Sequence, residues 1–168
     1  MPTDTDRLKK LENFDPSLDC FACGPNNPWG LHMTFRSDGT RVFSRLAVPA
    51  RYCGWEGVVH GGIVTALLDE IMSWSAHHLI RRLILTRSIR VEFSRPVPAE
   101  REISVTGWVA ERVKDREAIL ESEIHDADGT LCARGKGVFA LMTPAVARRL
   151  KVIEDRVIDA FEAFYPTP

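Results

Sequence analysis

The sequence predicts an α+β fold in which an antiparallel sheet of five to six strands wraps around one long central helix. Residues 61–80 are the only long stretch in the middle of the chain with helical periodicity. The segments on both sides of it alternate apolar and polar residues, as half-buried strands do. Strands that are grouped together, rather than alternating one by one with helices, favour an antiparallel sheet over a parallel α/β arrangement.

The composition is that of one ordinary globular domain. The 168 residues are 45% hydrophobic and 27% charged, with a formal net charge of −1. A chain of this length buries about 70% of its unfolded surface, so neither disulfides nor metals are needed to form a core. Basic and acidic residues are interspersed, and we therefore expect no nucleic acid partner.

Nothing in the chain predicts secretion or membrane insertion. Residues 1–19 lack the apolar segment of a secretory signal. No run approaches the roughly 18 uninterrupted apolar residues of a membrane span. We therefore expect a cytoplasmic protein without a membrane partner, whose four cysteines are reduced thiols.

The first third of the chain predicts an arm, a turn-rich segment and a hairpin. Residues 1–19 are polar and form either a loose N-terminal arm or a short helix around residues 6–13. Gly, Pro and Asn are dense in residues 20–30, which predicts turns. Residues 31–48 alternate on both sides of Ser-Asp-Gly-Thr and predict a hairpin. A loop follows over residues 49–59.

The second half predicts a run of strands and a final helix. Thr143 is suited to cap that helix and Pro144 to occupy its first position, and we expect the helix to run to about residue 164. We place one domain at residues 20–142 and a C-terminal helix and tail at residues 143–168. The expected strands cover residues 84–97, 102–113, 118–127 and 130–142.

The central helix has one apolar half and one unusual half. The second half is small and polar, with no Lys or Arg before Arg81. A solvated helix face normally carries charged side chains, so this face indicates close approach by another backbone or by a ligand. The apolar half holds Ile63, Val64, Leu67, Leu68, Ile71, Met72 and Trp74; the other holds Gly62, Thr65, Ala66, Asp69, Glu70, Ser73, Ala76 and His77.

Two carboxylates lie on or near the small polar face. Asp69 sits in its middle and Glu70 near its edge. A partly buried carboxylate costs free energy unless it is paired, so Asp69 is either satisfied by backbone or by Ser73, or held for chemistry.

The start of the helix, His60-Gly61-Gly62, favours the chemical interpretation. Two glycines weaken a helix, but they leave its N-terminal N–H groups accessible to an anion or a developing oxyanion. An oxyanion site and a carboxylate are the two parts that an ester or thioester hydrolase needs. Gly61 and Asp69 are about 12 Å apart along one helix. A two-fold dimer would bring Gly61 of one chain to Asp69 of the other.

Three segments carry a resemblance to a known family. They are VVHGGIVTALLDE, which contains His60-Gly61-Gly62 and Asp69, CFACGPNNPWGLHMTF and TRSIRVEFSRPVPAE. Over residues 20–142 the sequence resembles the hotdog-fold acyl-CoA thioesterases, specifically the phenylacetyl-CoA-pathway type (PaaI-like). The resemblance implies a hotdog fold, in which the sheet wraps the long helix, and hydrolysis of an acyl-CoA thioester to free acid and CoA.

The resemblance also implies roles for individual residues. Asp69 corresponds to the catalytic carboxylate, acting as general base or nucleophile, and Gly61 to the residue whose N–H polarises the thioester carbonyl. Thr86 corresponds to a position where some members carry a hydroxyl that orients water. His60, Gly62 and Glu70 then become candidates for binding substrate.

The same resemblance implies an assembly and a substrate but no separate cofactor. The minimal unit would be a homodimer with active sites at the interface, often doubled to a homotetramer. Acyl-CoA is the expected partner, and coenzyme A enters as part of it. Trp55, in the loop before the helix, is the aromatic residue best placed to contact the acyl group.

One position departs from the family pattern. Several members place Asn or Gln seven residues before the first glycine, where this chain has Gly54. Tyr52, Glu56 or His60 would have to take over that role. The alternative is a non-catalytic hotdog protein that binds acyl-CoA or another small ligand.

Two further patterns have a structural interpretation. Cys20-x-x-Cys23 is half of a zinc knuckle, but no second pair exists to supply four ligands, and Cys53, Cys132 or His32 would complete it only by accident of folding. We therefore expect a turn with packed thiols and no metal. We expect His77 and His78 to be cations at the helix C-terminus, where the helix dipole favours positive charge. Arg134 and Lys136 are expected to lie on a solvated strand face.

Overall fold

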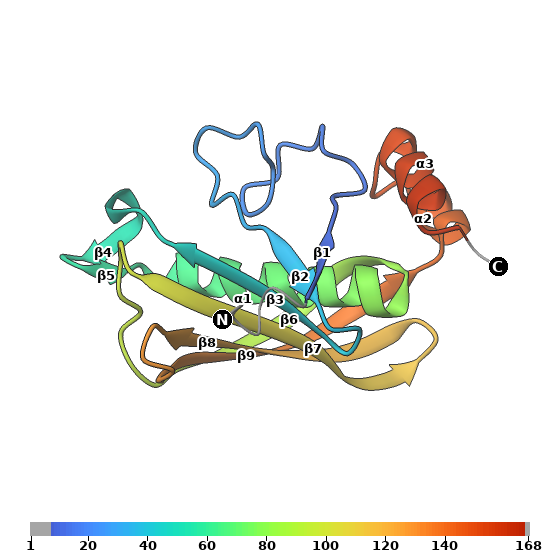
Figure 1. The fold of residues 1–168 in the computed structure, drawn as a ribbon. Coiled ribbons are helices and arrows are strands. Elements are labelled where there is room, and N and C mark those ends of the chain that lie inside the picture. Colours follow the sequence, from blue (N-terminus) through green and yellow to red (C-terminus); the bar gives the residue numbers. More distant parts are fainter. Residues whose placement is uncertain (1–7, 167–168) are drawn as a thin grey trace.

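An antiparallel sheet wraps around one central helix, as the sequence predicts, but the sheet has seven strands and not five or six. The structure, a computed structural model, describes residues 8–166. The strand order is β1-β2-β3-β7-β8-β9-β6, and helix α1 (Gly61–Ser75) lies across one face of the sheet (Figure 1). The sheet strands are β1 (Lys9–Leu11), β2 (Phe35–Ser37), β3 (Arg41–Ala47), β6 (Leu83–Phe93), β7 (Glu102–Lys114), β8 (Glu117–Asp126) and β9 (Leu131–Met142).

Smaller elements complete the chain. A 3₁₀ turn (Ala50–Tyr52) leads into a two-stranded ribbon of β4 (Cys53–Trp55) and β5 (Val58–Val59), which replaces part of the predicted loop just before α1. A π-helical turn (Ala76–Ile80) extends α1 to the end predicted for the long helix. Helices α2 (Pro144–Leu150) and α3 (Asp155–Phe164) close the described chain.

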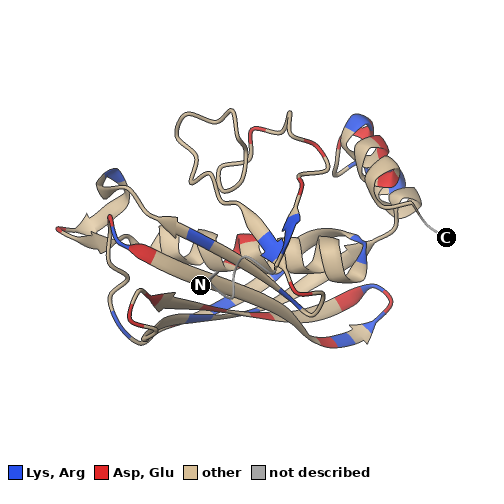
Figure 2. Ribbon diagram, viewed as in Figure 1, with Lys and Arg blue, Asp and Glu red and all other residues tan. Residues whose placement is uncertain are grey.

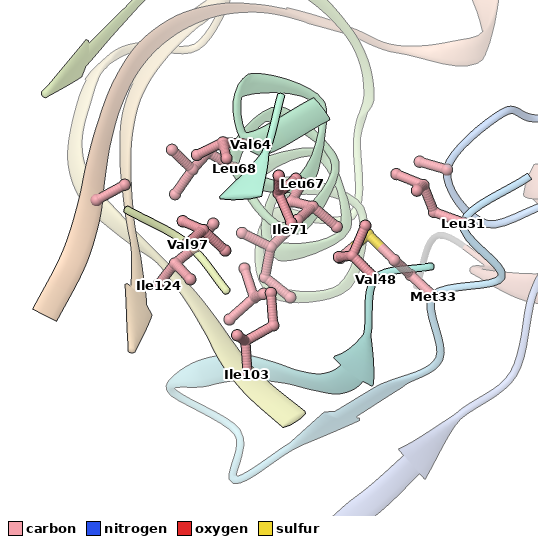
Figure 3. Packing of buried hydrophobic residues seen from close by; sticks show 14 of the residues in the cluster. Leu31, Met33, Val48, Val64, Leu67, Leu68, Ile71, Val97, Ile103 and Ile124 are labelled. Atoms are coloured by element: carbon pink, nitrogen blue, oxygen red, sulfur yellow. The ribbon is translucent and has the colours of Figure 1, made fainter. Parts of the chain in front are cut away.

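The apolar half of α1 packs into the concave face of the sheet. Val64, Leu67 and Ile71 are buried there. Figure 3 shows them between Ile103 and Ile124 of the sheet on one side and the segment with Leu31 and Met33 on another. Fully burying one such side chain contributes about 1.5–3 kcal/mol. Burial of this half of the helix therefore orients the opposite, polar half away from the sheet interior.

A glycine lets the helix approach the sheet closely. A Cβ atom built on Gly107 of β7 would lie 2.8 Å from the backbone oxygen of Ile71 and 2.8 Å from Ser75 Oγ. Both distances are shorter than a carbon and an oxygen can tolerate without a shift. Gly107 thus sets the depth at which α1 lies on β7.

The two edges of the sheet differ. Strand β6 lies at one edge and pairs only with β9 among the described strands, while the three-residue β1 forms the other edge. The β6–β9 register shifts between Thr86 and Ser88, which is a bulge near the middle of β6. Charged side chains of both signs are interspersed along the sheet (Figure 2). Arg134 and Lys136 are exposed and pair with Glu123 and Glu121 of β8, which confirms the solvated strand face.

The N-terminal region differs from its prediction. The helix considered around residues 6–13 is wrong for its described part, because Lys9–Leu11 form strand β1 and pair with Phe35–Ser37. Residues 1–7 of that expectation lie outside the described part. The polar sequence resembles an arm, but Leu11 is buried in the main core, and this contact makes the segment a sheet edge.

The C-terminal helix is also not continuous. Its predicted start is confirmed, because Thr143 Oγ1 accepts from Val146 N–H. Lys151 then adopts a left-handed conformation and ends α2. The break lets α3 fold back, so that Ile158 and Phe161 pack with Leu83. A straight helix would leave these apolar side chains in water.

His77 is not the cation that the sequence predicts. Its ring packs edge-on against Phe14 and Phe161. Burial lowers the pKa of His77 to about 4, so the ring is neutral at pH 7. Burial also lowers the pKa of His78, with Lys9 and Arg81 adding repulsion. Packing of the aromatic cluster therefore outweighs the helix dipole at this end.

Candidate active site

The N-terminus of α1 presents one free backbone donor. His60 caps the helix: its Nδ1 accepts from Gly62 N–H at 2.9 Å, and its carbonyl accepts from Ile63 N–H and Val64 N–H. Gly61 N–H has no acceptor within residues 8–166, and Gly61 is exposed. The cap therefore satisfies Gly62 and leaves Gly61 available to an anion.

His60 also explains the absence of a side chain at position 54. A Cβ atom on Gly54 would lie 3.2 Å from His60 Cδ2 and 3.4 Å from its Cα. Of the residues proposed to replace the missing amide, His60 is thus the one against Gly54. Tyr52 instead donates its hydroxyl to the Trp29 carbonyl, and Glu56 is exposed.

Asp69 and Thr86 lie together, one on α1 and one on β6. Thr86 Oγ1 donates to Asp69 Oδ1 at 2.9 Å across 17 residues of sequence. The bulge after Thr86 marks where the strand changes register beside the helix. Ser73 Oγ donates to the Asp69 backbone carbonyl at 3.0 Å and does not engage the carboxylate. The local alternative, in which backbone groups or Ser73 satisfy the Asp69 carboxylate by hydrogen bonds, is therefore not found.

The surroundings make Asp69 a stronger base than an exposed aspartate. Burial raises its pKa above the ordinary value of 3.8, and the hydrogen bond from Thr86 opposes that rise. Oδ1 is occupied by Thr86, and Oδ2 has no hydrogen-bond partner within residues 8–166. A half-buried carboxylate with one oxygen held and one oxygen open is suited to accept a proton or attack a carbonyl.

The surface around these groups is open and apolar in a single chain. Trp55 is 81% exposed, Phe93 56% and Leu85 41%. Phe93 lies at the helix N-terminus, since a Cβ on Gly61 would be 3.6 Å from its Cζ. Exposed large apolar groups beside an unpaired strand edge indicate an interaction surface. Trp55 is exposed, and its contact with an acyl group remains a prediction.

Glu70 faces away from this surface, toward the N-terminal turn. Its Oε1 accepts from Trp74 Nε1 at 3.1 Å, and Cys20 Sγ lies 3.8 Å from Oε1 and 3.9 Å from Oε2. Each of these partners comes from the chain itself. The substrate-binding role predicted for Glu70 remains a prediction, while its contacts place it in a different cluster.

This second cluster has strongly shifted pKa values. Burial, reinforced by the charge of Cys20, raises the pKa of Glu70 to about 7. The pKa of Cys20 is lowered to about 5, first because Cys23 donates a hydrogen bond to its sulfur and then because backbone N–H groups do so. The same hydrogen bond and burial raise the pKa of the Cys23 thiol.

Part of the chain is similar to a known protein family. Residues 56–133, which include Gly61, Asp69 and Thr86, match the family model described as Thioesterase superfamily. The central part of the chain is therefore similar to the thioesterase superfamily. No curated protein matches the chain. None of the helices within residues 8–166 combines the length and apolar character needed to cross a bilayer.

Solved structures show the same hotdog fold. A protein described as a thioesterase superfamily protein is 26% identical with a TM-score of 0.65, and the match covers 74% of this chain and 60% of that chain. The PaaI protein from the phenylacetic acid degradation operon of E. coli is 17% identical with a TM-score of 0.60, covering 67% and 80% of the two chains. Zebrafish thioesterase superfamily member 2 is 18% identical with a TM-score of 0.62, covering 70% and 89%.

The structure also brings forward residues that the sequence did not single out for these positions. The sequence predicts Phe93 only as part of a strand, but its side chain lies against the helix N-terminus. Cys20 and Cys23 form a spaced pair in the sequence, but nothing in the sequence links them to Glu70, which lies 50 residues from Cys20. A long-range contact of this kind leaves no local pattern.

Proposed function

We propose that this protein hydrolyses an acyl-CoA thioester to the free acid and CoA, with Asp69 as general base or nucleophile. The observation that carries the proposal is the Thr86–Asp69 hydrogen bond beside a helix whose first N–H, at Gly61, is free. The match of residues 56–133 to the thioesterase superfamily model supports the reaction class. The PaaI-like acyl preference and a cytoplasmic location are part of the proposal, as is the absence of a separate cofactor in the reaction.

Asp69, Thr86 and the Gly61 N–H would each have one role in the reaction. As general base, Asp69 takes a proton from water as its oxygen attacks the thioester carbonyl, and Thr86 holds the carboxylate in orientation. The carbonyl oxygen becomes negative and accepts a hydrogen bond from Gly61 N–H. The C–S bond then breaks, and the departing CoA thiolate takes the proton from Asp69. As nucleophile, Asp69 would instead attack the carbonyl and displace the CoA thiolate, and water would then hydrolyse the mixed anhydride to the free acid and restore the carboxylate.

The site would be shared between two copies of the chain. Gly61 and Asp69 are about 12 Å apart along α1, which is too far to serve one carbonyl. Strand β6 has 11 residues and an edge that no other strand within residues 8–166 pairs with, and its Leu85 and Phe93 are exposed. A second copy packed on this side would bring its own Gly61 toward Asp69 and cover the apolar groups. A dimer of such dimers would form the tetramer.

Thiol release from a panel of acyl-CoAs tests the proposal. We expect hydrolysis of at least one acyl-CoA by the unmodified protein. Asp69→Ala and Asp69→Asn should each reduce kcat by about 10²–10⁴-fold, because both remove the base and the nucleophile. Asp115→Asn, at an exposed aspartate in the β7–β8 turn, is the matched control and should keep the unmodified rate. Unchanged hydrolysis by both Asp69 variants would eliminate this mechanism.

The alternative, non-catalytic ligand binding, gives a different result in the same experiment. Acyl-CoA would then raise the thermal stability of the protein without any thiol release across the panel. The reason for this alternative is Gly54, which stands where several family members carry Asn or Gln. In the structure, His60 occupies the space beside Gly54. We propose that His60 takes over the role of the missing amide.

A further inference from the structure

A cluster of metal-ligating side chains lies beside Glu70, on a different side of α1 from the Thr86–Asp69 pair. Within residues 8–166, Cys20, Cys23 and Glu70 are the only group of three His, Cys, Asp or Glu side chains placed to share an ion. Their ligand atoms lie within 4.8 Å of one another. The proposed thioesterase chemistry uses none of the three.

We propose that Cys20, Cys23 and Glu70 bind a Zn²⁺ ion that clips the N-terminal turn to α1, with water as the fourth ligand. The donor set is two thiols and one carboxylate, which suits zinc better than the all-oxygen sites of Mg²⁺ or Ca²⁺. Bond lengths of about 2.3 Å to sulfur and 2.0 Å to oxygen place tetrahedral ligands about 3.5–3.8 Å apart. Cys20 Sγ is already 3.8 Å from Glu70 Oε1.

The turn that carries both cysteines is built tightly. Gly24 N–H donates to the Cys20 carbonyl at 2.8 Å. A Cβ on Gly24 would lie 2.6 Å from both the nitrogen and the oxygen of Cys20, so only glycine fits. Leu31 N–H and Met33 N–H hold the turn from outside by donating to Phe21 and Ala22. The two sulfurs are therefore presented by a fixed backbone and not by a mobile loop tip.

The third ligand, Glu70, is held in place by a hydrogen bond from Trp74. Trp74 Nε1 donates to Glu70 Oε1 at 3.1 Å, and the Trp74 ring stacks on Phe35 with centroids 4.2 Å apart. Ligating carboxylates in metal sites are commonly oriented by such a hydrogen bond. With Oε1 held by Trp74, the second oxygen, 3.9 Å from Cys20 Sγ, can turn toward the ion. The sequence predicts no metal because Glu70 lies 50 residues from Cys20 and no local pattern marks it as a ligand.

Metal titration under reducing conditions tests the proposal directly. The purified full chain would be stripped with a chelator and titrated with Zn²⁺ and with Co²⁺. We expect one ion per chain, a rise in thermal stability on adding Zn²⁺, and a cobalt spectrum with thiolate charge-transfer and tetrahedral d–d bands. Absence of those bands in the unmodified protein would overturn the site without reference to any variant.

Variants then assign the ligands. Cys23→Ser and Glu70→Gln should weaken binding by more than about 100-fold, and Trp74→Phe, which removes only the supporting donor, by about 10-fold. Cys53→Ser is the matched control, because Cys53 is a half-buried free cysteine outside the cluster; its affinity should match that of the unmodified protein. Equal weakening by Cys53→Ser, or a Cys20–Cys23 disulfide that persists in reductant, would overturn the proposal.

Discussion

Asp69 and Glu70 are consecutive in the chain, but the structure places them in two different surroundings. Asp69 faces β6, where a hydroxyl donates to it and the nearby strand edge is open. Glu70, turned by about 100° around the helix, faces Trp74 and Cys20. Burial raises the pKa of both carboxyl groups, and at Glu70 burial together with the charge of Cys20 raises the pKa to about 7. Adjacent carboxylates therefore acquire separate roles from their neighbours.

The largest expected effect concerns Gly61, whose N–H is proposed to act together with Asp69. Gly61→Pro deletes the free N–H, and proline is tolerated at the first position of a helix. His60 has φ −59° and ψ 137°, which suits the residue before a proline. We expect kcat to fall by about 10²–10³-fold with little loss of stability. Gly61→Ala keeps the N–H and is the control. Equal rates for the two variants would show that this N–H does not stabilise the oxyanion.

Mixing two inactive variants tests whether the site is shared. A heterodimer of an Asp69→Asn chain and a Gly61→Pro chain has one site with both native groups. After random exchange of subunits, about a quarter of the unmodified activity should return. No recovery, in a sample shown to contain heterodimers, would place Gly61 and Asp69 of one chain in the same site and contradict the dimer argument.

A smaller effect concerns a third ionisable group near the end of the same helix. Burial alone lowers the pKa of His77 from 6.5 to about 4, so the unfolded chain binds more protons between those values. Its contribution to stability is complete above pH 6.5 and is lost as the pH falls toward 4, by about 3 kcal/mol in all. His77→Phe should flatten this loss in urea unfolding measured at several pH values.

The exposed His32 supplies the control for that measurement. His32→Asn should leave the pH dependence of the free energy of unfolding unchanged. A slope that is the same in the unmodified protein and in His77→Phe would mean that His77 keeps its ordinary pKa. Burial would then not be the dominant cause of a pKa shift at His77.

The smallest expected effect separates Thr86 from Asp69. Thr86→Val keeps the shape of the side chain and removes its donor, so kcat should fall by about 10-fold. The hydrogen bond from Thr86 lowers the pKa of Asp69, so its loss raises that pKa. Because the base must be ionised, the acid limb of the pH–rate profile should move to higher pH. A lower rate with an unmoved limb would mean that Thr86 acts on water and not on Asp69.

Much of the fold follows from patterns that are local in sequence. The 3.6-residue period of residues 61–80 and the alternation in the last four strands record which side of each segment is buried, and the structure has those elements nearly where they were expected. The Gly-Gly start and Asp69 were likewise visible in one short segment. Such patterns report burial but do not name the neighbour that causes it.

The sequence alone determined the central helix, the long strands and the pairing of a glycine-rich helix start with a carboxylate, because each depends on residues a few positions apart. Only the tertiary structure decided that residues 9–11 join the sheet, that Lys151 splits the final helix, that His60 fills the space at Gly54 and that Glu70 faces Cys20. These features depend on contacts between distant segments, which packing selects after the local elements have formed.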